Sequence, residues 1–441
     1  MKTNFRYVIW LMVSILLLSC GGGSGDKKLC QVVEQNSCSI PSQNQCTYEI
    51  MEEYYYWYRQ LAAIDDYSAF SSPAQTLDYL RYYPDGPDKY SYLTSESYYI
   101  DRMSNGQLLA YGLSMITDTD GRVWVRYSYQ DSAAGRAGIE RGDEIVSING
   151  QTLTNITSNP DWTTIFGPSQ EGYPIDMVIA KPGGTTESIH MLKTTVNINT
   201  VLHSSVIDGG AIKTGYLVFQ SFLETSNAEL AQVFADFKAA GVNRVILDLR
   251  YNGGGRVSVA NNLASYLYKV NNTSTVFNRL TFNDKHQSKN SSYHLVPMLN
   301  ALSIDQLIVI TTPGTCSASE MVINGLSPYL PVKTVGGTTC GKPIGMNPFF
   351  FCGNALLPIM FEAQNSQHVG GYFDGIAADC PAEDDVTTSF ADAADPMLSQ
   401  ALYLAGNGSC KPQAARAASK PAVTYVHKKG TGRIDEIISA Y

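Results

Sequence analysis

Apolar runs that alternate with amphipathic stretches in the second half of the chain constrain its fold more than any other feature. Each apolar run has the length of a buried strand, and helical patterns lie between the runs. The strand patterns are "TGYLVFQSF" (214–222), "NRVILDLR" (243–250), "DQLIVITT" (305–312) and "VKTVGG" (332–337). The helical patterns are "NAELAQVFADFKAAG" (227–241), "VSVANNLASYLYK" (257–269) and "SASEMVINGLSPYL" (317–330). This alternation predicts an α/β domain with a mostly parallel sheet, covered on both faces, which we place at residues 198–410.

Residues 99–197 show a different pattern, in which short strands are joined by turns that contain glycine. The strand patterns are "QLLAYGLSM" (107–115), "GRVWVRYSY" (121–129), "IDMVIAKPGG" (175–184) and "ESIHMLK" (187–193). One short helix is expected at 133–137. The region therefore predicts a small β-rich domain.

Residues 46–98 predict a helical N-terminal domain. Apolar and aromatic residues recur there at helical spacing, namely Ile50, Tyr54, Trp57, Tyr58 and Leu61. Ser72 followed by Pro73 is typical of a second helix start. We expect the aromatic residues to pack inward, and the alternative is a surface that stacks on carbohydrate or bases.

The N-terminus has the features of an exported lipoprotein. Two basic residues precede an apolar run at 8–18, which is too short to span a bilayer as a mature helix but suits a signal peptide. "LLSC" resembles a bacterial lipobox, which would make Cys20 the lipidated first residue of the mature chain; an ordinary signal peptide is the alternative. We predict a lipoprotein signal peptide at 1–20 and a flexible linker at 21–45. The protein would then be anchored to a bacterial membrane, on its periplasmic face or at the cell surface.

Composition narrows the class further. Hydrophobic residues are 44% and charged residues 16% of the 441, which is typical of a globular chain, and the net charge of −9 offers no basic surface for nucleic acid. An Ala- and Lys-rich tail at 411–441 is expected to be loosely ordered. Eight cysteines follow Cys20, an even number that favours disulfides in an exported protein, and their spacings do not match a zinc site.

Two serines follow the strand pattern at 305–312. Ser317 and Ser319 lie where a helix begins, and the free N–H groups of a helix N-terminus can stabilise an oxyanion. Ser317 and Glu320 also form an S-x-x-E capping pattern, which needs no catalysis. On this segment alone, a helix cap and a nucleophile both remain open.

Two glycine-rich segments also follow strand patterns. In "ILDLRYNGGGRV" (246–257), the glycines at 253–255 would let backbone amides approach a substrate carbonyl. The alternatives are a simple turn and a weak phosphate loop, although no Lys-Ser/Thr pair follows. In "GGTTCGKPIGM" (336–346), Lys342 is either a solvated charge or, if desolvated, a neutral general base.

These three segments, in this order, resemble the C-terminal processing peptidases, also called tail-specific proteases. The motifs of that family are DLRxNxGG, SASE and GKxxxQ, and its catalytic lysine follows the nucleophilic serine by 25 residues. Lys342 follows Ser317 by 25 residues, so the resemblance selects these two as base and nucleophile and leaves Ser319 as a helix residue. It implies a serine endopeptidase that needs no metal or organic cofactor. The oxyanion would be held by the N–H groups of Gly254 and Ala318.

The resemblance extends over about residues 47–405. "DKYSYL" (88–93), "FDGIAADC" (373–380) and "DPMLSQALYL" (395–404) resemble further family segments, with Ala378 where the family has proline. The β-rich domain resembles a PDZ domain in "YGLSM" (111–115) and "AGIERGDEIVSINGQ" (137–151). The resemblance implies that amides around Tyr111, Gly112 and Leu113 receive the C-terminal carboxylate of a protein or peptide substrate with an apolar tail.

Two departures from the family concern the lysine. The family glutamine that orients the lysine is Met346 here, and the neighbouring Asn347 could replace it. Cys316 precedes the nucleophile, and Cys340 lies two residues before Lys342. We expect a disulfide that ties the serine loop to the lysine loop, and the alternative is two small buried thiols.

Two functions from other classes remain as alternatives. A catalytically weak or inactive peptide-binding lipoprotein of the same fold is favoured by Met346 and opposed by the retention of Ser317 and Lys342. An α/β hydrolase with a Ser-His-Asp triad would require a G-x-S-x-G turn, which the chain lacks. His368 is the only histidine that follows Ser317 within the resembling region.

Overall fold

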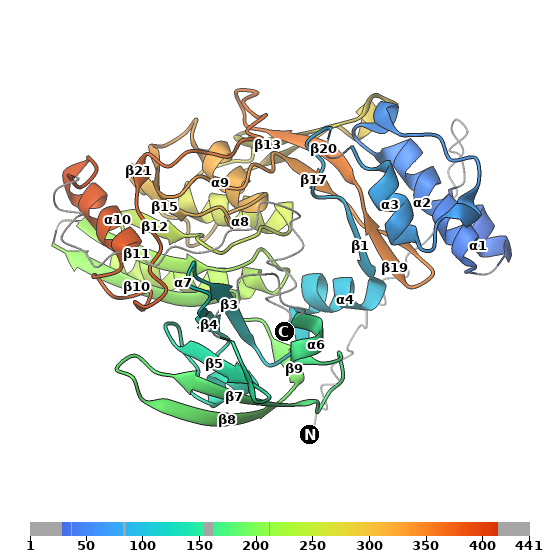
Figure 1. The fold of residues 1–441 in the computed structure, drawn as a ribbon. Helices are drawn as coiled ribbons and strands as arrows, with labels where there is room; N and C mark the ends of the chain where they lie inside the picture. The colour runs from blue at the N-terminus through green and yellow to red at the C-terminus, as the bar shows by residue number, and fades with distance from the viewer. Residues whose placement is uncertain (1–28, 37, 83–84, 154–161, 211, 413–441) are drawn as a thin grey trace, which may run out of the picture.

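The computed structural model describes residues 29–36, 38–82, 85–153, 162–210 and 212–412. The expected signal peptide, the lipidated Cys20 and the tail beyond residue 412 lie outside the described residues. Within the described ranges, no helix is both long and apolar enough to cross a membrane. Figure 1 shows N-terminal helices in blue, a β-rich domain in teal and green, and an α/β domain in light green to red.

A six-stranded sheet forms the centre of the α/β domain. Its strand order is β10-β11-β12-β15-β16-β21, in which β10 and β11 pair antiparallel and all other neighbours pair parallel. The strands are β10 (Val201–Gly209), β11 (Ile212–Phe219), β12 (Arg244–Asp248), β15 (Leu307–Thr311), β16 (Val332–Gly336) and β21 (Cys380–Pro381). The mostly parallel sheet predicted from the apolar runs is confirmed.

Helices cover both faces of this sheet, because alternate side chains of each strand point to opposite faces. Three helices pack on one face, and α10 packs on the other face, together with Tyr127 and Tyr129 of the β-rich domain. The helices are α7 (Ser226–Ala240), α8 (Val257–Leu267), α9 (Ala318–Leu326) and α10 (Pro396–Asn407). Helix α7 ends at Gly241, as predicted, with a left-handed φ of 75°.

The β-rich domain is an antiparallel sheet of order β3-β4-β5-β7-β8, with β6 paired to β5 and with β3 at one edge. A separate pair, β2 with β9, lies where the domain joins the rest of the chain. The strands are β2 (Gln107–Ala110), β3 (Leu113–Thr117), β4 (Val123–Ser128), β5 (Glu144–Ile148), β6 (Gln151–Thr152), β7 (Pro174–Ala180), β8 (Thr186–Leu192) and β9 (Thr194–Asn197). Two short helices accompany them, α5 (Ala133–Arg136) and α6 (Trp162–Phe166). The strand expected at 107–115 is broken in two, because Gly112 adopts a left-handed φ of 88°.

Two smaller antiparallel sheets, which the sequence patterns did not predict, connect the α/β domain to the N-terminal helices. Their orders are β14-β13-β20-β17 and β1-β19-β18. The strands are β1 (Tyr92–Ser95), β13 (Val276–Phe282), β14 (Ser291–His294), β17 (Ile344–Met346), β18 (Phe349–Phe351), β19 (Asn354–Leu357) and β20 (Ile359–Gln364). Most of these strands are too short for a period of two to be recognised.

The N-terminal region contains α1 (Gln31–Asn36), α2 (Ile40–Tyr54), α3 (Pro73–Leu80) and α4 (Glu96–Ile100). Ser72 caps α3 as predicted, because its hydroxyl accepts the N–H of Gln75 at 3.2 Å. The expected inward packing is confirmed for Ile50, which is buried, and in part for Trp57 and Tyr58, which pack at the edge of the same core.

The flexible linker expected at 21–45 is wrong for the residues that the structure describes. Helix α1 and the start of α2 occupy much of this segment. Two disulfides, Cys30–Cys46 and Cys38–Cys352, tie it to the rest of the molecule. The segment has little apolar surface of its own, so its composition suggested a linker. The two disulfides hold it in place instead.

Candidate active site

Ser317 lies in the turn that joins β15 to α9. Its φ of 56° and ψ of −112° belong to a region that residues with side chains rarely adopt, whereas an ordinary helix cap is extended. This strain is expected at a functional turn rather than at a simple helix start. The other candidate, Ser319, is fully buried, and its hydroxyl donates to the carbonyl of Asn252 at 3.0 Å.

Cys316 and Cys340 form the expected disulfide, at a sequence separation of 24 residues. Cys340 belongs to the lysine loop, which we define as residues 337–343 between β16 and β17. The bond therefore joins the serine turn covalently to the lysine loop. The side chain of Glu320 lies within 4.8 Å of both sulfur atoms. With the sulfurs bonded to each other, this group offers no thiolate for a metal ion.

Glu320 joins the same two segments a second time. Its buried Oε2 accepts the N–H of Ser317 at 2.8 Å and the N–H of Lys342 at 2.9 Å. Its Oε1 accepts the N–H of Gly341 at 2.9 Å and the hydroxyl of Thr339 at 2.5 Å. Burial raises the pKa of Glu320, although these donors favour its charged form. The glutamate of the capping pattern thus also positions the lysine loop.

Tyr90, from the N-terminal region, makes a third contact with the lysine loop, in addition to the disulfide and Glu320. The Nζ of Lys342 lies 4.9 Å from the centre of the Tyr90 ring. The Tyr90 hydroxyl donates to the carbonyls of Cys340 at 3.1 Å and Gly341 at 3.2 Å. An aromatic ring and a fixed loop backbone therefore restrict where the Lys342 side chain can lie.

The two residues expected to influence the orientation of Lys342 lie in different environments. Met346 ends β17 and packs against the apolar core that contains Tyr90. Asn347 is exposed. Both line the same cavity as Lys342.

A cavity of about 1050 Å³ brings the candidate residues together, since Ser317 and Lys342 both line it. Part of its wall is apolar and is formed by Val257, Leu280, Phe282, Met321 and Phe361. A cavity of this size and lining can enclose several residues of an apolar peptide.

Gly254 lies against the serine turn. A Cβ atom on Gly254 would lie 2.9 Å from the Cys316 carbonyl oxygen and 3.0 Å from the Ala318 nitrogen, so only glycine fits at this position. The Gly254 N–H donates to Asn252 Oδ1 at 2.9 Å. Ala318 is the first residue of α9, so its N–H has no carbonyl partner within the helix.

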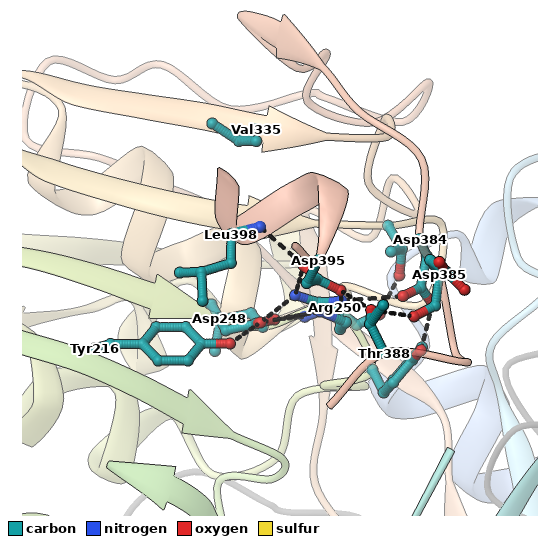
Figure 2. Close-up of polar contacts among 12 residues, drawn as sticks. Tyr216, Asp248, Arg250, Val335, Asp384, Asp385, Thr388, Asp395 and Leu398 are labelled. Carbon is teal, nitrogen blue, oxygen red and sulfur yellow. Dashed lines mark hydrogen bonds and ion pairs between the residues drawn. The ribbon is translucent and has the colours of Figure 1, made fainter. Parts of the chain in front are cut away.

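A buried group of charges surrounds Arg250, which comes shortly before the glycine segment in the chain (Figure 2). Arg250 pairs with Asp248 at 2.7 Å, Asp395 at 2.9 Å and Asp384 at 3.0 Å. Arg250 is 1% exposed, so its charge depends on these three carboxylates rather than on water.

Arg141 connects the β-rich domain to this network. Its guanidinium pairs with Asp384 at 3.0 Å and donates to the hydroxyl of Tyr251 at 2.9 Å. Tyr251 directly follows Arg250 and precedes the glycine segment. A residue of the β-rich domain therefore contacts the side chain of Tyr251, which lies two residues before the glycines that border Ser317.

Comparison with known proteins agrees with this architecture. The model of peptidase family S41 matches residues 213–380, the model of the S41 N-terminal domain matches 42–92, and a PDZ domain model matches 124–159. The α/β domain, through residues 213–380, belongs to peptidase family S41. The β-rich domain of this S41 chain is its PDZ domain.

Curated relatives and a solved structure share parts of this S41 chain. It is 26% identical to the chloroplastic carboxyl-terminal-processing peptidase 3 of Arabidopsis thaliana over 247 residues, which are 54% of this chain and 46% of the relative. It is 25% identical to the carboxy-terminal processing protease CtpA of Bacillus subtilis over 231 residues, which are 52% and 46% of the two chains. The S41 chain thus spans about half the length of these relatives. A crystal structure of a proposed S41 protease from Bacteroides fragilis has the same fold, with a TM-score of 0.66, 24% identity and coverage of 82% of this chain and 97% of the other.

The expected carboxylate loop of the PDZ domain is buried. Tyr111, Gly112 and Leu113 are each at most slightly exposed. The carbonyl of Tyr111 accepts the N–H of Ala134 at 2.9 Å. Strand β3, which follows the loop, lies at the edge of its sheet, where an extended peptide could add as a further strand.

Sequence patterns did not reveal the roles of Tyr90, Arg141 and Glu320. The partners of Tyr90 and Arg141 lie far away in the chain, with separations of 250 residues for Tyr90 and Cys340 and 243 for Arg141 and Asp384. The only signal was that Glu320 follows the serine in the capping pattern.

Proposed function

We propose that this S41 chain is an exported serine endopeptidase that hydrolyses peptide bonds near protein C-termini, with Ser317 as nucleophile and Lys342 as general base. One observation carries the proposal. The strained turn of Ser317 and the loop of Lys342 are joined by the Cys316–Cys340 disulfide and by Glu320, and both residues line one cavity.

The proposed reaction is acyl transfer to water. Uncharged Lys342 removes the hydroxyl proton of Ser317 as its oxygen attacks the scissile carbonyl. The N–H groups of Ala318 and Gly254 would hold the oxyanion. The Gly254 N–H donates to Asn252 Oδ1 in this structure. To hold the oxyanion, it would have to divide its hydrogen bond between the two oxygens or leave Asn252. Lys342 then gives the proton to the leaving amine, and water releases the acyl group by the reverse use of the same residues.

The proposed role of the PDZ domain is to select the tail. A peptide would add to the edge of β3, with its terminal carboxylate at the amides of Tyr111, Gly112 and Leu113. These residues are buried, so tail binding would require a local opening of the loop. The contact of Arg141 with Tyr251 supports the idea that a movement of the PDZ domain would shift the segment beside Ser317.

The direct test of this function is hydrolysis of peptides with apolar tails. Ser317→Ala should lower kcat/KM by at least about 1000-fold, and Ser319→Ala should leave cleavage measurable. Mapping C-termini in cells that carry either the wild-type or the Ser317→Ala protein would identify the substrates. Undiminished cleavage by Ser317→Ala protein would contradict the assignment.

The proposed location is a lipid anchor at Cys20 on a bacterial membrane. Metabolic labelling with a palmitate analogue should mark the wild-type protein and not Cys20→Ala protein. Labelling that survives the substitution would remove the anchor from the proposal.

The second candidate is a peptide-binding protein of the same fold that is weakly active or inactive, and Met346 favours it. A methionine lacks the amide oxygen with which a glutamine at this position would accept a hydrogen bond from the lysine. Met346→Gln should raise kcat/KM if the lysine is poorly oriented. An inactive protein that binds tails and gains no activity from this change would support the second candidate.

A further inference from the structure

The cavity that holds Ser317 is lined by several cationic side chains and, among the described residues, by no Asp or Glu. Besides Lys342, its cationic lining residues are Lys89, Arg102, Arg126 and Arg256. The whole chain carries a net charge of −9, so this lining differs in sign from the protein around it. A cleft lined by one sign of charge attracts ligand groups of the opposite sign.

Arg126, on strand β4, differs from the other buried arginines at this domain junction. It is 7% exposed, and its Nε has no hydrogen-bond partner within the described part of the chain. Its guanidinium instead lies over the ring of Tyr251, 5.1 Å from the ring centre. By contrast, Arg141 and Arg250 are both paired with Asp384 at 3.0 Å.

A buried guanidinium is costly unless it is paired with an anion, so the position of Arg126 requires a physical reason. Arg126 and Arg102, which is 8% exposed, both line the cavity. Tyr251, beneath Arg126, is followed at once by Asn252 and the glycine segment. The uncompensated charge therefore lies beside the segment proposed to hold the oxyanion.

We propose that Arg126, with Arg102 nearby, forms a carboxylate subsite inside the active-site cavity. It would receive the C-terminal carboxylate of a substrate tail or an acidic side chain close to the end of that tail. A planar guanidinium suits this task because it can donate two parallel hydrogen bonds to one carboxylate. The subsite is separate from the PDZ loop at 111–113, so one terminal carboxylate would occupy the two sites in turn: the loop while the tail is selected, and the Arg126 subsite while the tail lies in the active-site cavity. It rests on the proposed function, and it adds that only a short tail follows the scissile bond.

Binding to protein that cannot cleave tests the subsite independently of catalysis. Fluorescence anisotropy would measure the Kd of an apolar hexapeptide for Ser317→Ala protein. Three peptides are compared: one with a free C-terminal carboxylate, one amidated, and one amidated with an added internal Glu. Each is measured in the Ser317→Ala background alone and combined with Arg126→Gln. The matched control combines Ser317→Ala with Arg136→Gln, which removes an exposed arginine of the same domain.

The free carboxylate should improve binding over the amide by about 10- to 100-fold, and Arg126→Gln should reduce this ratio at least about tenfold. Arg136→Gln should leave the ratio unchanged. If the internal Glu restores binding in an Arg126-dependent way, the subsite accepts side-chain carboxylates as well. Equal binding of acid and amide to the Ser317→Ala protein overturns the proposal without any second variant. A ratio that survives Arg126→Gln also overturns it, because the carboxylate is then read elsewhere. Loss of catalysis alone would not change these Kd values, so failure of the proposed function would be recognised separately.

Discussion

Two junctions of this molecule bring distant segments together by different means. At the catalytic junction, the serine turn and the lysine loop are joined by one disulfide and by one carboxylate that accepts backbone N–H groups. At the domain junction, the PDZ domain meets the α/β domain through the ion pairs of Arg141 and Arg250. The first junction is covalent and independent of salt, whereas the second depends on charge.

The pKa values of the carboxylates at the two junctions are shifted in opposite directions. Burial alone would raise the pKa of Asp384, but Arg141 and Arg250 lower it overall. Burial raises the pKa of Glu320, because its partners are N–H and hydroxyl dipoles rather than full charges. The catalytic pair is thus held in a fixed position by a covalent bond, while the domain contact depends on the charges of its ion pairs.

The largest effect is expected from removing the central cation of the domain junction. Arg250→Met would leave Asp248, Asp384 and Asp395 buried close together, so we expect a loss of about 3–5 kcal/mol in the free energy of unfolding. Denaturant unfolding measures it, with the exposed Arg136→Met as control. A loss below about 1 kcal/mol would show that the network contributes little.

The catalytic junction should respond to loss of its disulfide. The double variant Cys316→Ser/Cys340→Ser should lose about 2–4 kcal/mol in the free energy of unfolding. It should also react more slowly at Ser317 with a serine-directed phosphonate. Cys380→Ser with Cys410→Ser removes a disulfide of similar span, 30 residues against 24, away from the lysine loop. That control should lose stability without losing labelling. Equal labelling in both double variants would contradict a positioning role for the first disulfide.

Acid should weaken the domain junction only at low pH, because the pKa of Asp384 is lowered, whereas Glu320 at the catalytic junction has a raised pKa and takes up its proton at a higher pH. The lowered pKa of Asp384 means that its stabilising contribution is complete above the usual value near 4 and is lost as pH falls through the lowered value. Arg141→Gln should remove about 1–3 kcal/mol of stability at pH 7 and make the junction less sensitive to acid. Hydrogen exchange in strands β4 and β5, followed from pH 7 to pH 3, would measure this. An unchanged pH dependence in the variant would contradict the role given to the ion pair.

The smallest effect is expected from the tyrosine beneath the lysine. Tyr90→Phe removes the hydrogen bonds to Cys340 and Gly341 and should lower the free energy of unfolding by about 1 kcal/mol. Tyr90→Leu also removes the ring, which stabilises the charged form of Lys342, so its rate should reach half-maximum at a lower pH than in Tyr90→Phe. Identical pH–rate profiles for the two variants would exclude the ring contact.

Local patterns in the sequence predicted most of the central fold. Continuous apolar strands, the cap at Ser72 and the glycine that ends α7 are local signals, and the structure contains all three. The 25-residue spacing and the cysteines beside it predicted the Cys316–Cys340 disulfide. Ordering of the segment at 31–45 could not be predicted, since it depends on disulfides such as Cys38–Cys352, whose pairing is not encoded locally.

Covalent labelling separates the serine–lysine assignment from every alternative in one experiment. A fluorescent phosphonate, followed by mass mapping of the modified peptide, should place the adduct on Ser317 in the wild-type protein. Ser319→Ala protein should still carry this adduct, Lys342→Met protein should acquire it at least about 100-fold more slowly, and Ser317→Ala protein should not acquire it. An adduct on another residue, or an unchanged rate in Lys342→Met protein, would contradict the serine–lysine assignment.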